Sequence, residues 1–147
     1  MARSEIVARG REEWQRKRSD RDWRGWVRIM EAVEIGRDET DKKLHNRITP
    51  GGGRKGRNKG SGWNKAFGQW LRDNGFEDLD GKKFGQLRSR MMDCIDSKQA
   101  IETWRRDLLD LSQRQAWNHP VTVWSHFAAH QKAEAARARG EDPDKKS

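Results

Sequence analysis

The chain has 147 residues, of which 37% are charged and 32% hydrophobic, and its formal net charge is +9. This length is typical of one domain with a modest core. Eight tryptophans exclude a fully disordered chain, since disordered chains contain few aromatic residues and each buried tryptophan contributes roughly 150–250 Å² of buried surface. We therefore expect a compact core with solvated ends.

The single cysteine, Cys94, excludes an internal disulfide and a zinc site built from several cysteines. Its apolar helical position favours a small buried hydrophobe over a nucleophile. The use of a single cysteine indicates a reducing compartment. No apolar run reaches the ~18–20 residues of a membrane span, and the first residues lack the apolar stretch of a signal peptide. We expect a cytoplasmic protein without membrane association.

Helical periodicity of the apolar residues runs through most of the chain. Residues 1–19 alternate charges and predict a helical N-terminal arm with little to bury. A helix over about 22–46 follows, with Asp20 or Asp22 as its N-cap. The further predicted helices cover residues 63–74, 81–95, about 97–117 and about 121–139.

Turn residues separate these helices. Gly75 is typical of a left-handed C-terminal cap, Asp80 of an N-cap, and Pro120 of a helix boundary next to the capping turn at His119. No alternation of period two predicts a strand. The prediction is an all-α, single-domain bundle of about five helices, comprising an arm (1–19), a helical domain (20–139) and a disordered tail (140–147).

The segment 49–62, TPGGGRKGRNKGSG, combines six glycines with four cations and contains no acidic or apolar side chain. It carries +4 of the net charge of +9, whereas residues 63–147 together carry +2. Such a long basic loop cannot pack a core, and clustered phosphate contacts are the favoured explanation. The cations are Arg54, Lys55, Arg57 and Lys59.

Two other interpretations of this segment are a nucleotide-binding loop and a flexible linker. A nucleotide-binding loop needs Gly-Lys followed by Ser or Thr after a strand, whereas Gly56 precedes Arg57 and Asn58 and follows a helix. A flexible linker with incidental charge stays open as an alternative. The preferred interpretation is a basic loop that follows a phosphate backbone or a minor groove.

The helices over 63–74 and 81–95, joined through Gly75, match the outline of a helix-turn-helix, although the turn of about six residues is longer than usual. A plain solvated face is the alternative. The N-terminal arm is expected to add contacts to the phosphate backbone. The candidate groove-reading residues are Lys82, Lys83, Gln86, Arg88 and Arg90, and those of the arm are Arg16, Lys17 and Arg18.

Histidines and tryptophans allow further interpretations. His126 and His130 lie four residues apart on a helix but lack the pattern of a metal site, so surface or interface histidines are preferred. Most tryptophans follow apolar stripes and are predicted to be core. Trp14 and Trp117 have polar neighbours and are the exposed candidates for stacking on bases.

Together these patterns predict a small non-enzymatic protein, without cofactor or metal, that binds nucleic acid. Double-stranded DNA is the preferred target and RNA the second, in a regulatory or architectural role. The alternative is a helical interaction module in which the region 119–130 docks a second copy or another protein and the basic segment is a linker. Salt dependence of binding separates these two functions.

Overall fold

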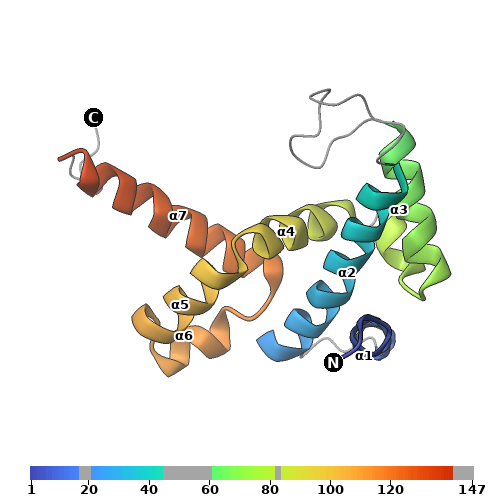
Figure 1. Ribbon diagram of the computed structural model, residues 1–147. Helices are drawn as coiled ribbons and strands as arrows, with labels where there is room; N and C mark the ends of the chain where they lie inside the picture. Colours follow the sequence, from blue (N-terminus) through green and yellow to red (C-terminus); the bar gives the residue numbers. More distant parts are fainter. Residues whose placement is uncertain (17–20, 45–60, 82–83, 141–147) are drawn as a thin grey trace.

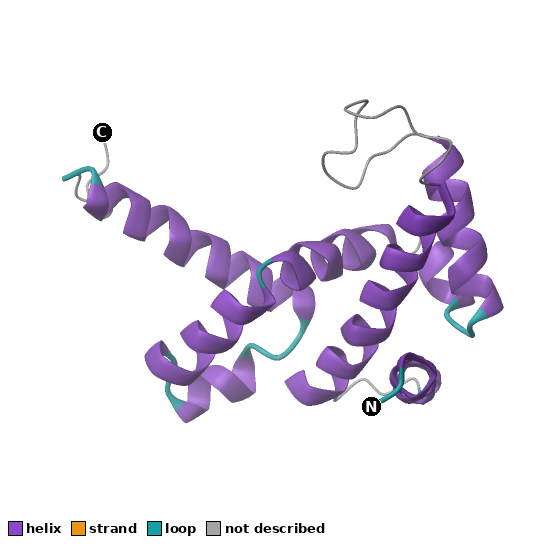
Figure 2. Cartoon of the chain, viewed as in Figure 1, coloured by secondary structure: helices purple, strands orange, loops and turns teal. Residues whose placement is uncertain are grey.

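The computed structural model describes residues 1–16, 21–44, 61–81 and 84–140, and over these residues the chain is helical without a strand (Figures 1 and 2). The all-α prediction is confirmed, and a helical bundle fits the arrangement. The described elements are α1 (Arg3–Gln15), α2 (Trp23–Leu44), α3 (Ser61–Asp73), the 3-10 helix η2 (Glu77–Asp80), α4 (Gly85–Asp96), α5 (Lys98–Leu108), α6 (Leu111–Ala116) and α7 (Pro120–Ala138).

The described part contains seven α-helices rather than about five, partly because the helix predicted over 97–117 is two helices. Leu109 is buried in an extended conformation and ends α5. Asp110 then starts α6 with a capping box. The Asp110 carboxylate accepts from the Gln113 N–H, and the Gln113 side chain accepts from the Asp110 N–H. Local capping thus interrupts a continuous apolar period.

Helices α1 and α3 both pack against α2. The N-cap of α2 is Asp22, whose carboxylate accepts from the Gly25 N–H at 2.9 Å. Glycines allow both neighbours to approach closely. A Cβ on Gly10 of α1 would lie 2.7 Å from the Arg28 carbonyl oxygen, and one on Gly36 would lie 2.4 Å from the Trp70 ring. Helix α1 therefore packs closely against α2 and is not a free arm.

The predicted left-handed cap at Gly75 is confirmed, with φ of +85°. The Phe76 N–H donates to the Leu71 carbonyl at 2.7 Å, and the Gly75 N–H donates to Arg72, which together form a Schellman motif. The predicted cap at Asp80 is wrong, because residues 77–80 form η2 and α4 begins only at Gly85. Burial of Phe76 and of Leu79 within η2 shapes this connection.

Helix α4 connects the two halves of the bundle. Its apolar side chains, Met91 and Cys94 among them, are buried, and α7 packs against it with Val123 fully buried. Trp104 of α5 contacts Phe127 of α7 edge to face, with ring centroids 5.5 Å apart. Beyond this contact α7 projects away from the other helices (Figure 1). None of the described helices is both long and apolar enough to cross a membrane.

Replacing Gly10 by alanine should lower the free energy of unfolding by about 1–3 kcal/mol, because the added methyl group would push α1 off the α2 backbone. Gly62→Ala is the matched control, since its Cβ would meet nothing within 4 Å and alanine favours a helix more than glycine does. Urea denaturation of both variants measures the difference. Equal losses in the two would contradict close packing at Gly10.

Candidate nucleic-acid interface

The cations predicted to bind phosphate in the segment 49–62 lie outside the described residues, but the structure shows what flanks them. The end of α2 and the start of α3 lie side by side (Figure 1). The Trp63 indole N–H donates to Asp41 at 2.7 Å, and the Trp63 ring stacks on Phe67. Leu44, at the end of α2, is buried. The segment therefore connects two helix ends that are fixed to each other.

Three further cations surround this junction. Lys42 and Lys43 occupy the last turn of α2, Lys65 lies in the second turn of α3, and all three are exposed. The sequence did not single out Lys42 and Lys43, because residues 27–48 carry no net charge. The tertiary structure adds these lysines to the predicted basic segment, because it brings the two helix ends together.

The residues predicted on α4 do not form one free basic face. The Arg88 guanidinium donates to the Leu79 carbonyl at 2.9 Å, and Arg90 forms an ion pair with Asp93 at 3.0 Å. Gln86 is exposed. Lys82 and Lys83 lie outside the described residues. Five of the twelve residues of α4 are buried, and its accessible side includes the acidic residues Asp93 and Asp96.

The predicted helix-turn-helix is not confirmed. Residues 74–84, including the whole of η2, separate α3 from α4, whereas the turn of that motif has three or four residues. The longer connection buries Phe76 and Leu79. Packing of these two side chains therefore decides the spacing of the two helices.

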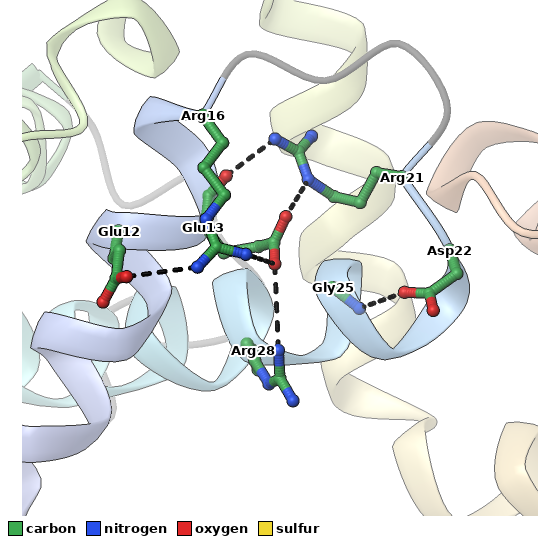
Figure 3. Close-up of polar contacts among 7 residues, drawn as sticks. All are labelled: Glu12, Glu13, Arg16, Arg21, Asp22, Gly25 and Arg28. Carbon is green, nitrogen blue, oxygen red and sulfur yellow. Dashed lines mark hydrogen bonds and ion pairs between the residues drawn. The ribbon is translucent and has the colours of Figure 1, made fainter.

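A buried ion pair lies where α1 meets α2 (Figure 3). The Arg21 Nε donates to Glu13 Oε2 at 2.9 Å, its Nη2 donates to the Glu13 carbonyl at 2.8 Å, and both side chains are 4% exposed. The Arg21 guanidinium also lies 4.8 Å from the centre of the Trp26 ring. The sequence does not reveal this pair, because the alternating charges of residues 1–19 are also typical of an exposed helical surface.

Arg16, predicted to contact a phosphate backbone, lies at the C-terminal end of α1 and is half-exposed. It forms an ion pair with Glu12 at 3.1 Å and approaches Glu13 at 3.7 Å. The other two predicted residues of the arm, Lys17 and Arg18, lie outside the described residues.

The two tryptophans predicted to be exposed are both packed. Trp14 is 9% exposed and contacts Trp26 and Phe84, so its prediction is wrong. Trp117 is partly buried between Trp104 and His126, with ring centroids 6.1 and 3.7 Å away and nearly parallel planes. Both indole rings are covered by residues that are not their neighbours in the sequence. The polar neighbours in the chain therefore do not reveal this burial.

His119 is the N-cap of α7, which confirms the predicted capping turn. Its Nδ1 accepts from the Val121 N–H at 3.2 Å, and its ring meets Trp26 edge to face at 4.9 Å. Burial, and to a lesser extent the nearby charge of Arg21, lowers the pKa of His119 below its ordinary value. Because the capping nitrogen accepts a hydrogen bond, the neutral imidazole is the form that this position requires.

Cys94 is fully buried, as predicted, and burial raises the pKa of its thiol to about 12. Its Sγ lies 3.7 Å from the Pro120 carbonyl oxygen. A thiol in such surroundings is unreactive at neutral pH. Within the described ranges, no three side chains of His, Cys, Asp or Glu come together as ligands for a metal ion.

An open, mainly apolar groove of about 810 Å³ lies between α2 and α5. Val27 and Ile95 contribute to its lining. Two polar contacts connect the helices across it, since the Trp23 indole donates to Glu102 and Lys98 pairs with Glu34, each at 2.8 Å. Three cations and three acidic residues are among its lining residues, so the groove has no marked preference for an anion.

Comparisons of the chain with protein-family models, with curated proteins and with solved structures give no match. The function must therefore be inferred from the residues and geometry of the chain itself.

Replacing Glu13 by glutamine should lower the free energy of unfolding by about 3–5 kcal/mol, because the buried Arg21 would lose its counter-charge. The double variant Glu13→Gln, Arg21→Met should lose less than the single one, because no unpaired charge is then buried. Urea denaturation of both variants measures this. A larger loss in the double variant would show that packing of Arg21 on Trp26 outweighs its charge.

The lowered pKa of His119 predicts a stability that depends on pH. The unfolded chain takes up the proton more readily, so the contribution is complete above the ordinary pKa of about 6.5 and is lost as the pH falls through the lower folded value. His119→Asn retains a capping side chain without this titration. Between pH 7.5 and 5 the wild type should lose more stability than the variant, and parallel curves would contradict the prediction.

Proposed function

We propose that this protein binds nucleic acid, preferably double-stranded DNA, through the basic segment between α2 and α3. The supporting observation is the division of charge. Residues 45–60 contain five cations and no acidic residue, which accounts for five of the net charge of +9. The described residues carry a nearly balanced charge. A phosphate backbone is the ligand that matches such a concentration of cations.

The fixed ends of the segment strengthen this proposal. The hydrogen bond from Trp63 to Asp41 holds together the two helix ends that flank the segment. Lys42, Lys43 and Lys65 extend the positive charge onto the folded surface at that point. Because these lysines lie on helices, they are held near the segment and can contact the same backbone.

Base reading by α4 is the finer part of the proposal. Gln86 is an exposed side chain of α4 with both donor and acceptor groups, and the partly exposed Arg90 lies one turn further along the helix. Asn or Gln pairs with adenine and Arg with guanine in a major groove. We propose a non-enzymatic regulatory or architectural role, with RNA as the second target.

A protein-interaction module is the second candidate, favoured by the face that α5, α6 and α7 form. Leu108 and Leu111 are 61% and 63% exposed. Two shallow hollows next to Leu108 are lined by Trp104 and His130. Exposed apolar residues beside a hollow are typical of a protein contact, so this face favours a protein partner or a second copy near the region 119–130.

Replacing Arg54, Lys55, Arg57 and Lys59 together by glutamine should weaken binding to all duplexes alike. The slope of log K against log salt should become shallower by up to ~3.6, about 0.9 for each lost phosphate contact. Fluorescence anisotropy with a labelled duplex between 50 and 300 mM salt measures the slope. Single-stranded DNA and RNA in parallel identify the preferred nucleic acid.

The control is a quadruple variant with the same total charge, in which four exposed cations of α5, α6 and α7 become glutamine (Arg106, Arg114, Lys132 and Arg137). Its slope should stay near that of the wild type. Equal effects in the two variants would show that only the net charge matters and would remove the segment from the binding site. Gln86→Ala should act on particular base pairs only.

A further inference from the structure

Three arginines surround one buried carboxylate at the corner between α1 and α2 (Figure 3). Arg21 is buried and makes the two short hydrogen bonds to Glu13. Arg16 and Arg28 approach the other carboxylate oxygen, Oε1, at 3.7 and 3.8 Å, which are ion-pair distances too long for hydrogen bonds. Their side chains are 49% and 42% exposed.

The donors of these two arginines are largely unused. In the part of the chain that the structure describes, the long ion pair with Glu13 is the sole polar contact of the Arg28 side chain. Arg16 has one further partner, the exposed Glu12. Each guanidinium has five N–H donors, so both retain donors for a ligand that approaches from solvent.

Their positions suit one tetrahedral anion. Since the Nη1 atoms of Arg16 and Arg28 both lie within 3.8 Å of the same oxygen, they are separated by no more than about 7.5 Å. A phosphate group that accepts hydrogen bonds of about 2.8 Å on two sides can reach both nitrogens. Three guanidinium groups against the carboxylates of Glu12 and Glu13 also leave a positive balance at this corner.

The corner is held rigidly. The close contact between Gly10 and the Arg28 carbonyl fixes the backbone of α2 against α1, and the buried pair of Glu13 with Arg21 fixes the end of α1. A ligand therefore meets two arginines whose backbone is already in place, which reduces the entropy lost on binding.

From this geometry we infer that Arg16 and Arg28 form a phosphate site that contacts a phosphodiester of the bound nucleic acid. The inference rests on the proposed function and adds a folded contact site to the basic segment. Arg28 belongs to it only through tertiary structure, because it lies 12 positions after Arg16 in the chain. Glu13 and Arg21 are positioning residues beneath the site.

Arg28→Gln should make the slope of log K against log salt shallower by about 0.9 with a duplex, the value for one phosphate contact. Lys132→Gln removes the same charge from an exposed position on α7 and should leave the slope unchanged. Arg28→Lys keeps the charge and should retain the slope. The long and half-exposed ion pair of Arg28 contributes little to stability, so the variant should fold, and circular dichroism checks this.

The outcomes distinguish the two proposals. If the wild type binds a duplex with a steep salt dependence and Arg28→Gln has the same slope as Lys132→Gln, the phosphate site is overturned. The proposed function is then unaffected. Wild type that binds no nucleic acid would overturn the proposed function and its phosphodiester contact.

Inorganic phosphate is a second, independent probe of the same arginines. Titration into the free protein should shift the NMR signals of the Nε–H groups of Arg16 and Arg28, and the Arg28→Gln variant should lose the shift of Arg16. Unchanged signals at millimolar phosphate would show that the corner does not bind this anion. Shifts in a protein that binds no nucleic acid would establish the anion site alone.

Discussion

The buried carboxylate of Glu13 must be neutralised inside the protein, and this requirement determines how the first two helices meet. Its partner Arg21 precedes α2 and also packs on Trp26, so one guanidinium group connects the end of α1, the start of α2 and the aromatic core. Breaking such a pair costs several kcal/mol because a charge would be left in a poorly solvated place. Arg16 and Arg28 lie around the same carboxylate, so the structural constraint also positions the proposed phosphate site.

Charge is divided unevenly between the helices and the segment that connects α2 to α3. The helices balance cations against acids, and many of these charges have partners within the protein, as Arg90 has in Asp93. A balanced surface does not attract a polyanion over long distances, whereas a run of cations without acids does. Both proposed contact sites adjoin α2, one near its first turns and one at its end. This helix would therefore orient the two sites relative to one another on a nucleic acid.

Much of the helical organisation could be predicted, because it depends on neighbours in the chain. The caps at Asp22, Gly75 and His119 are local hydrogen-bonding arrangements, and each residue acts as its sequence context predicts. The break at Asp110 was missed because the apolar period continues through it and the capping box that starts α6 competes with that period. Trp14 was misread because its neighbours in the chain are polar, while Trp26 and Phe84, which cover it, are distant in sequence.

The sequence by itself determined that the protein is all-α, where most helices begin and end, and where its unbalanced cations lie, since these follow from periodicity, capping and composition. Tertiary structure decided which charges are available to a ligand. It joins Arg88 to a carbonyl and Arg90 to Asp93, buries Arg21, and leaves Arg28 half-exposed beside Arg16. The physical reason is that exposure and pairing of a long charged side chain depend on the helix packed against it, and chain position alone does not specify that helix.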